Sequence, residues 1–203
     1  MPSPTIAAGY PRGLVDFAVS KGADRAALLA RADIEPEALT DQDNRVSVAK
    51  YVALFGATAD LTGIPAISLE YGKAVRMQEI SIVGLICEAC ERVTDVPIQL
   101  NRYVQLVVDD DRGEPATLMR GVAKNGGAWI EGPSALFTEN PIIAETELAR
   151  LVWNTRVMFA NTPEFQTIKF PRVVHLMHKA PAYATEFERI FEAGLQHLFD
   201  QAH

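Results

Sequence analysis

The sequence contains little of what a disulfide-stabilised or membrane-embedded protein needs. Only 2 of its 203 residues are cysteine, too few for the disulfide framework of small secreted proteins. No apolar run approaches the roughly 20 residues of a membrane span, and the N-terminus lacks the layout of a signal peptide. A composition that is 48% apolar and 22% charged can form a sizeable core. We therefore expect a globular, cytoplasmic protein.

Positive charge is also scarce. The chain has 19 lysines and arginines against 26 aspartates and glutamates, which gives a net charge of −7 at pH 7. A surface with this excess of carboxylates repels the phosphate backbone of nucleic acids. We therefore expect that this segment makes no direct contact with DNA, and we predict no contact with a membrane.

The first half of the chain has the apolar periodicity of helices. Ser47 is a suitable N-cap, and apolar residues follow it at helical spacing until Gly63 ends the helix. Asp24 can cap an earlier helix in the same way. We further predict a long apolar helix over residues 82–93 and another over 95–107, with Ile98, Leu100 and Val104 facing inward.

An acidic run over residues 109–115 separates this half from the rest of the chain. Its glycine and proline disfavour a continuing helix, and its clustered carboxylates favour solvent. The run does not have the alternating oxygen ligands of a calcium-binding loop. We therefore predict a single domain over residues 1–203, composed of a helical half, 11–108, and a smaller α/β half, 115–203.

The second half combines strands with helices. Asn125-Gly126 can adopt the positive φ values of a type I′ turn, so residues 117–123 and 128–130 predict a β-hairpin. Asn140-Pro141 is typical of a helix start and predicts a long helix. The predicted fold class is α+β, with an N-terminal helical layer followed by a small mixed α/β half.

Two segments carry a pattern that is more specific than secondary structure. In residues 173–199, an apolar strand leads through His178-Lys179-Ala180-Pro181 into a short helix and a second strand. Together with Leu39–Gly72, this order of motifs resembles the N-terminal effector-binding (arabinose-binding-like) domain of AraC/XylS-type transcription regulators over roughly residues 11–199. The family-like residues in the first segment are Asp43, Arg45, Tyr51, Leu54, Thr62, Gly63, Pro65, Leu69 and Gly72.

The resemblance implies a ligand sensor without enzymatic activity. In such regulators a linker and a pair of helix-turn-helix units follow the sensor, and residues 200–203 cannot supply them. We therefore expect a C-terminal DNA-binding domain that is absent from this chain. The resemblance also implies a small-molecule effector, a homodimer and no cofactor. The effector would act by population shift, through its differential affinity for two arrangements of the protein.

Cys87 and Cys90 form a C-x-x-C pair, which can be a redox dithiol or half of a zinc site. A redox pair usually lies at a helix N-terminus, where the helix dipole lowers the pKa of the thiol. Here the apolar-leaning residues 81–86 precede the pair, and no second C-x-x-C is present. We interpret both cysteines as small apolar core residues. A redox or metal sensor built on them is an alternative.

His175 and His178 are a second possible centre of chemistry. On one strand, a spacing of three would direct them to opposite faces, so we place His175 on a strand and His178 at the start of a turn. A small enzyme that uses both histidines with a carboxylate is another alternative. No G-x-S-x-G elbow or glycine-rich phosphate loop supports it. We predict no catalytic residue and no metal ligand.

An effector pocket is expected to be concave, mainly apolar and fitted with a few polar groups. Our candidates for ligand binding are Trp129, Trp153, Arg156 and His175. The two tryptophans could form an apolar wall, and Arg156 is close enough in sequence to place a cation near Trp153. These residues predict a small ligand with an apolar body and an anionic end, such as an organic acid or an acyl compound.

Overall fold

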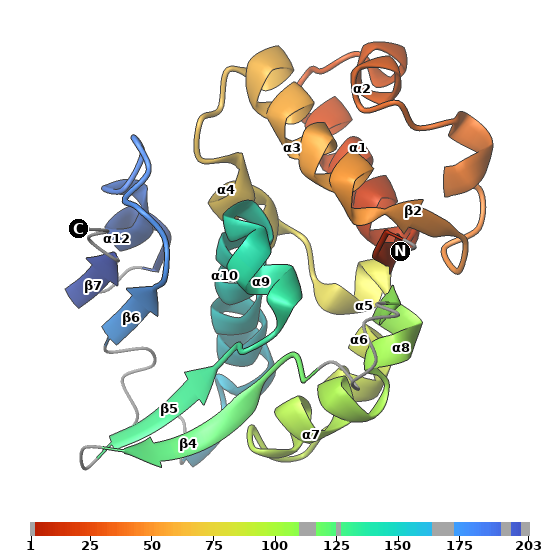
Figure 1. Cartoon of the computed structure of the whole chain (residues 1–203). Helices are drawn as coiled ribbons and strands as arrows, with labels where there is room; N and C mark the ends of the chain where they lie inside the picture. The colour runs from red at the N-terminus through yellow and green to blue at the C-terminus, as the bar shows by residue number, and fades with distance from the viewer. Residues whose placement is uncertain (1–2, 110–116, 125–126, 164–172, 192–195, 200–203) are drawn as a thin grey trace.

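The computed structural model describes residues 3–109, 117–124, 127–163, 173–191 and 196–199, and it shows a mixed, mainly helical α/β protein (Figure 1). The helices of the first half are α1 (Gly9–Ser20), α2 (Arg25–Arg31), η1 (Pro36–Leu39), α3 (Val48–Thr62), α4 (Ile67–Ala74), α5 (Met77–Ile80), α6 (Ile82–Glu88), α7 (Asp95–Arg102) and α8 (Val104–Val107). The elements of the second half are β4 (Arg120–Lys124), β5 (Gly127–Glu131), α9 (Ala135–Glu139), α10 (Pro141–Phe159), β6 (Val173–Leu176), α12 (Glu186–Phe191) and β7 (Gln196–Phe199).

The predicted helix boundaries around α2 and α3 are confirmed. The Asp24 side chain accepts a hydrogen bond from the Ala27 amide at 2.8 Å, and the Ser47 hydroxyl accepts one from the Lys50 amide at 3.3 Å. Gly63 ends α3 with a φ of +68°. That backbone conformation is costly for other residues, which explains why glycine marks the end of this helix.

A short N-terminal sheet corrects the prediction that the first half is purely helical. The strands β1 (Thr5–Ala7), β2 (Arg45–Ser47) and β3 (Val108–Asp109) form an antiparallel sheet in the order β2-β1-β3. Strands of two or three residues are too short to show an alternating pattern. The Arg45 guanidinium donates to the carbonyls of Gln105 and Val107, and it thereby ties β2 to α8.

The predicted helix over residues 82–93 is too long, and two of its apolar residues face outward. Helix α6 ends at Glu88, and Ile82 and Leu85 are about half exposed. Gly84 determines this orientation, because a β-carbon there would overlap the backbone of Met77 on α5. Because Gly84 has no side chain, α6 can approach α5 closely on this face. Ile98 on α7 is likewise exposed, so the prediction of an inward Ile98 is also wrong.

The predicted hairpin and long helix of the second half are confirmed. Strands β4 and β5 pair antiparallel, from Arg120 opposite Glu131 to Lys124 opposite Gly127, whereas the Asn125-Gly126 turn lies outside the described residues. Helix α10 starts at Pro141 as predicted. The Asn140 amide, however, donates to the Leu136 carbonyl and makes no capping bond to α10.

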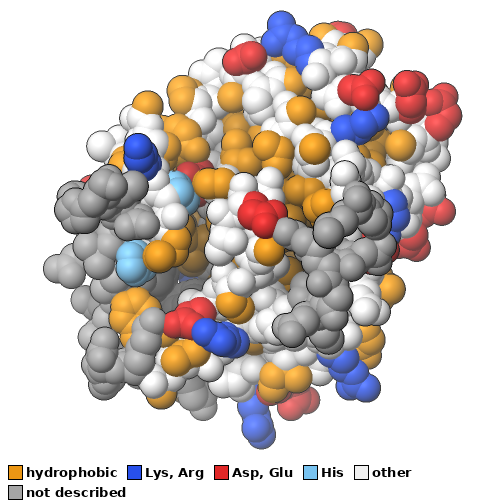
Figure 2. Space-filling model, viewed as in Figure 1, with side chains coloured by type: hydrophobic (Ala, Val, Ile, Leu, Met, Phe, Trp, Pro, Cys, Tyr) orange, Lys and Arg blue, Asp and Glu red, His pale blue; other side chains and the backbone are white. Residues whose placement is uncertain are grey.

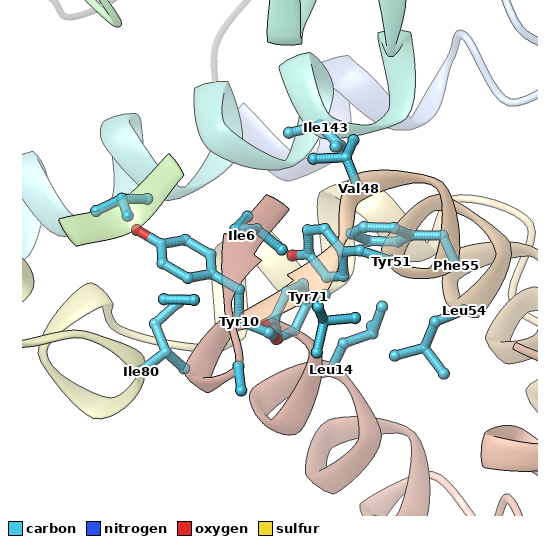
Figure 3. Packing of buried hydrophobic residues seen from close by; sticks show 14 of the residues in the cluster. Ile6, Tyr10, Leu14, Val48, Tyr51, Leu54, Phe55, Tyr71, Ile80 and Ile143 are labelled. Atoms are coloured by element: carbon cyan, nitrogen blue, oxygen red, sulfur yellow. The ribbon is translucent and has the colours of Figure 1, made fainter. Parts of the chain in front are cut away.

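The main core lies between the N-terminal helices, the short sheet and α10. Figure 3 shows Tyr10, Tyr51 and Tyr71 meeting in this core, together with Ile6 of β1 and Ile143 of α10. All five side chains are at most 2% exposed. Three tyrosines in one apolar core bring polar hydroxyl groups into a region from which water is excluded.

A second core joins the closing unit, residues 173–199, to the other side of α4 and α10 (Figure 1). Strands β6 and β7 are parallel and α12 lies between them in sequence, so the predicted strand-helix-strand unit is confirmed. Leu69 of α4 and Val152 of α10 pack in this core with Phe187 and Phe191 of α12. Helix α10 therefore contributes to both cores.

The surface carries the expected excess of negative charge. Figure 2 shows acidic side chains grouped at the upper right, over the part of the chain between α2 and β2. That segment has five exposed carboxylates: Asp33, Glu35, Glu37, Asp41 and Asp43. Among the described residues no single helix is long and apolar enough to span a membrane, and the consecutive pair α3 and α4, which reaches the required length together, is bent by 99°.

Candidate functional site

The described residues enclose a mainly apolar cavity between the N-terminal sheet, helices α5 to α8 and helices α9 and α10. Its volume is about 50 Å³. A single water centre needs roughly 10–15 Å³, so the cavity has room for a small organic molecule. Apolar lining residues include Ile6, Val96, Leu118, Leu136, Phe137 and Ile143.

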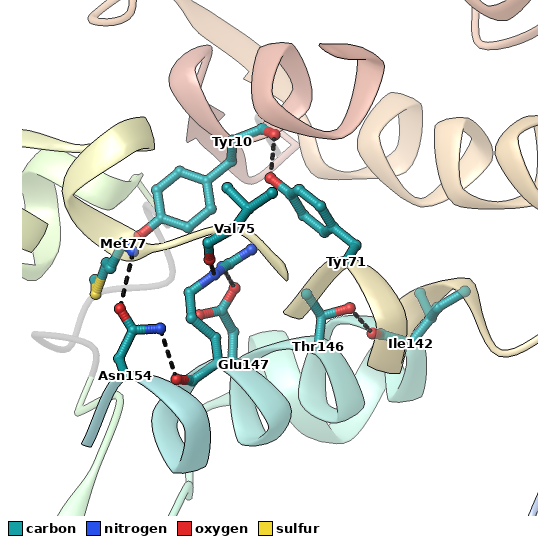
Figure 4. Close-up of polar contacts among 9 residues, drawn as sticks. Tyr10, Tyr71, Val75, Met77, Ile142, Thr146, Glu147 and Asn154 are labelled. Carbon is teal, nitrogen blue, oxygen red and sulfur yellow. Dashed lines mark hydrogen bonds and ion pairs between the residues drawn. The ribbon is translucent and has the colours of Figure 1, made fainter. Parts of the chain in front are cut away.

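One side of the cavity is polar because of three residues on α10. Glu147, Arg150 and Asn154 follow each other at spacings of three and four, which places them on one face of the helix. The Asn154 amide is held in place at both ends: its oxygen accepts from the Met77 amide at 3.1 Å, and its nitrogen donates to the Arg150 carbonyl at 2.8 Å (Figure 4). These bonds fix the polar face of α10 against α5.

Arg150 is the most deeply buried charge at this site, with 1% of its surface exposed. Its Nη1 forms an ion pair with Glu147, and its Nε donates to the Val75 carbonyl at 3.4 Å. Its guanidinium carbon lies 4.9 Å from the ring centre of Tyr71 and 5.6 Å from that of Tyr10. Burial lowers the pKa of Arg150, but Glu147 and the tyrosines outweigh it and the pKa is raised. The guanidinium is therefore permanently charged.

The surrounding tyrosines are neutral at physiological pH. Burial raises the pKa of Tyr71 to about 12 even though the Arg150 cation opposes the shift, and burial also raises the pKa values of Tyr10 and Tyr51. The Tyr71 hydroxyl donates to the Tyr10 carbonyl at 3.0 Å. Tyr10 and Tyr71 thus place neutral rings beside the Arg150 guanidinium without adding charge.

The comparison with known families agrees with this architecture. Residues 22–203 match the family described as the N-terminal arabinose-binding domain of AraC transcription regulators. The chain belongs to this family. No curated protein matches the chain closely enough to be counted as a relative. The family match confirms the resemblance seen in the sequence, and it identifies the chain as a ligand-sensing regulatory domain that takes a small-molecule effector.

None of the four binding residues predicted from the sequence lines the cavity of this arabinose-binding domain. Trp129 is half-buried on β5, and His175 is exposed on β6. Trp153 and Arg156 do lie together, with the Arg156 guanidinium 5.4 Å from the Trp153 ring centre. Both, however, bind the closing unit: Trp153 donates to the Ile190 carbonyl at 2.9 Å and Arg156 to that of Phe191 at 2.5 Å.

The polar residues that do line the cavity were not singled out in the sequence. A Glu and an Arg three residues apart on a helix are usually a solvated pair, as Glu186 and Arg189 are in α12. Glu147 and Arg150 have the same spacing, yet Arg150 is buried. In the sequence around this pair, only the apolar residues on both sides indicate that it is buried. The sequence therefore contains the pair, but only tertiary packing buries Arg150 and places both residues beside the cavity.

A second buried polar cluster joins the closing unit of the arabinose-binding domain to α4 and α10. One oxygen of Glu145, a residue that is 2% exposed, accepts from the Ser68 and Tyr183 hydroxyls at 2.6 Å each. The other oxygen lies 3.5 Å from the His178 Nε2. His178 follows β6 in the turn, as predicted, and contributes to docking. Neither His175 nor His178 lines the cavity.

The cysteines do not have the environment of a redox or metal centre. Burial raises the pKa of Cys87 to about 12 and raises that of Cys90 above its usual value, which disfavours the thiolate form of both. In the described part of the chain, no three His, Cys, Asp or Glu residues are grouped so that they could hold a metal ion. Cys87 lines the cavity as an apolar residue.

This environment predicts low reactivity of Cys87. The thiolate is the reactive form, so we expect iodoacetamide at about pH 8 to modify Cys87 much more slowly in the folded domain than in denaturant. Cys90, which is only partly buried, should react first. Mass spectrometry of digested samples over time measures both rates. Modification of native Cys87 at the rate of an unfolded thiol would contradict its burial.

Proposed function

We propose that the cavity beside α10 is the effector site, and that effector binding there controls DNA binding by a domain joined to this one. The observation that carries the proposal is the combination of a mainly apolar cavity with one polar face formed by Glu147, Arg150 and Asn154. Small-molecule sites in proteins typically have this composition, in which apolar walls supply affinity and a few polar groups supply orientation.

The lining favours a small organic molecule with an apolar body. The family is named for arabinose, but a sugar carries a hydroxyl on almost every carbon, and each buried hydroxyl needs a hydrogen-bond partner. Most of the lining, which includes Leu100, Val107, Leu118 and Met119, offers none. An acyl compound or another mainly apolar molecule therefore matches this cavity better than arabinose does.

Helix α10 provides a physical route from the cavity to the rest of the protein. Its Glu147 and Arg150 face the cavity, whereas Trp153 and Arg156 bind carbonyls of α12 in the closing unit. An effector that favours one position of α10 would favour one position of the closing unit, by no more than its differential affinity. We further propose that the domain acts as a homodimer in the cytoplasm, where such a signal would reach the DNA-binding parts.

A ligand screen tests the site and the function together. We would measure melting temperatures with arabinose, acyl compounds, organic acids, amino acids and alcohols, because a ligand at 100 times its Kd stabilises the native state by about 2.7 kcal/mol. The blocking variant is Val96→Phe, which adds volume at a lining position of α7. The matched control is Val157→Phe, at an exposed position of α10.

We expect a stabilising compound to lose its effect in Val96→Phe and to keep it in Val157→Phe, each compared with the same variant without ligand. A compound that stabilises both variants equally binds outside the cavity, and that result would refute this site. If no compound class shifts the melting temperature of the parent protein, the sensor function itself loses its support.

A further inference from the structure

One buried donor at the cavity, Nη2 of Arg150, makes no hydrogen bond of good geometry to any described residue, although the Arg150 side chain interacts with the Tyr71 hydroxyl. Arg150 lines the cavity and is 1% exposed. A buried donor on a charged group that is left unpaired is costly, so a native protein usually pairs it with a protein group, a water or a ligand. A molecule bound in the cavity is one of these three kinds of partner.

The guanidinium cannot easily turn to find another partner. Glu147 binds Nη1, the Val75 carbonyl accepts from Nε, and the rings of Tyr71 and Tyr10 flank the group. These contacts come from α10, from the segment that follows α4, and from α4 and α1. A donor that is held in this way is preorganised, so a ligand would gain its hydrogen bond at little cost in side-chain entropy.

The charge of the lining indicates what kind of acceptor fits. Among the described residues that line the cavity, Glu147 and Arg150 are the only Asp, Glu, Lys or Arg, and they pair with each other. The net charge of this described lining is therefore zero. A carboxylate ligand would bring an additional negative charge into an apolar space, which costs free energy unless a free cation compensates it. A ligand with a neutral oxygen adds no charge and leaves the ion pair of Glu147 and Arg150 intact.

We propose, resting on the effector site above, that the effector is a mainly apolar molecule with a neutral carbonyl oxygen, as in a ketone, an ester or an amide, and that Arg150 Nη2 donates to this oxygen. This inference chooses between the two classes expected from the sequence: it favours an acyl compound and disfavours an organic acid. It also replaces Arg156 by Arg150 as the residue that recognises the polar end.

The test uses matched ligands that differ only in the polar group. Short-chain methyl ketones, carboxylates and alkanes of equal length are titrated against the parent protein by calorimetry or thermal shift. Since a hydrogen bond from a charged donor contributes about 1.5–3 kcal/mol, we expect the ketone to bind about 10- to 100-fold more tightly than the alkane. The carboxylate should bind more weakly than the ketone.

A double variant, Glu147→Gln with Arg150→Met, tests the residue. It removes both charges together and so avoids an unpaired buried carboxylate that would unfold the protein. We expect this variant to bind ketone and alkane with nearly equal affinity. Val157→Phe, outside the cavity, should keep the full preference for the ketone.

Each outcome separates this inference from the proposed function. Tightest binding by the carboxylate would overturn the neutral acceptor while leaving the cavity as the effector site. Equal binding of ketone and alkane by the parent protein, or a ketone preference that persists in the double variant, would overturn the role of Arg150. Absence of binding by all three classes, together with a failed wider screen, would overturn the effector site and this inference with it.

Discussion

The single substitution Arg150→Met is expected to lower the free energy of unfolding by about 3–5 kcal/mol. It leaves the Glu147 carboxylate, whose side chain is 14% exposed, without the cation that it binds. It also removes the hydrogen bond to the Val75 carbonyl and the contacts with the rings of Tyr10 and Tyr71. Urea unfolding followed by circular dichroism measures the change.

The double variant Glu147→Gln with Arg150→Met is the control for this prediction. Replacing a buried ion pair by uncharged side chains of similar size is often neutral for stability, whereas removing one partner is not. We therefore expect the double variant to recover most of the stability that the single variant loses. If Arg150→Met alone were as stable as the parent protein, Glu147 would have to be well solvated, in conflict with the observed burial.

The second large effect is expected at the contact between α4 and α10. Substituting Gly72 by alanine should destabilise the domain by about 1–3 kcal/mol or more, because the added β-carbon would overlap the Thr146 carbonyl oxygen and come within 2.8 Å of the Ala149 β-carbon. The two helices would have to separate, which would disturb both cores that share α10. A lower melting temperature in calorimetry measures this effect.

Gly56→Ala is the matched control, since Gly56 lies inside α3 and no atom comes within 4 Å of the position that an added β-carbon would take. Alanine has a higher helix propensity than glycine, so this variant should be more stable by about 0.5–1 kcal/mol. Because the two substitutions are expected to change the stability in opposite directions, they separate the effect of steric overlap from that of helix propensity. Equal effects of the two substitutions would show that α4 and α10 are not closely packed at Gly72.

The family-like residues in the first segment have structural reasons in this fold. Tyr51 and Leu54 belong to the main core, Arg45 ties β2 to α8, and Gly72 lets α4 approach α10. These residues stabilise the fold around the cavity and do not line the cavity itself. This explains why the sequence motifs identified the family but did not point to the cavity that we propose as the effector site.

Local sequence determined several parts of this protein by itself. Asp24, Ser47 and Gly63 mark helix ends because capping depends on a side chain or a backbone conformation within a few residues. The hairpin of β4 and β5 followed from turn residues in the same way, and the closing unit was expected from the family resemblance. The excess of carboxylates set the sign of the surface charge.

Tertiary structure alone decided which face each helix buries and where the site lies. Gly84 faces α5 and turns Ile82 and Leu85 outward, against the apolar pattern of the sequence. Arg150 is buried because α4, α1 and the segment after α4 close over it, although its spacing from Glu147 is that of a surface pair. Burial depends on contacts between residues far apart in the chain. Local sequence therefore specified the elements of this domain, and only their packing created its site.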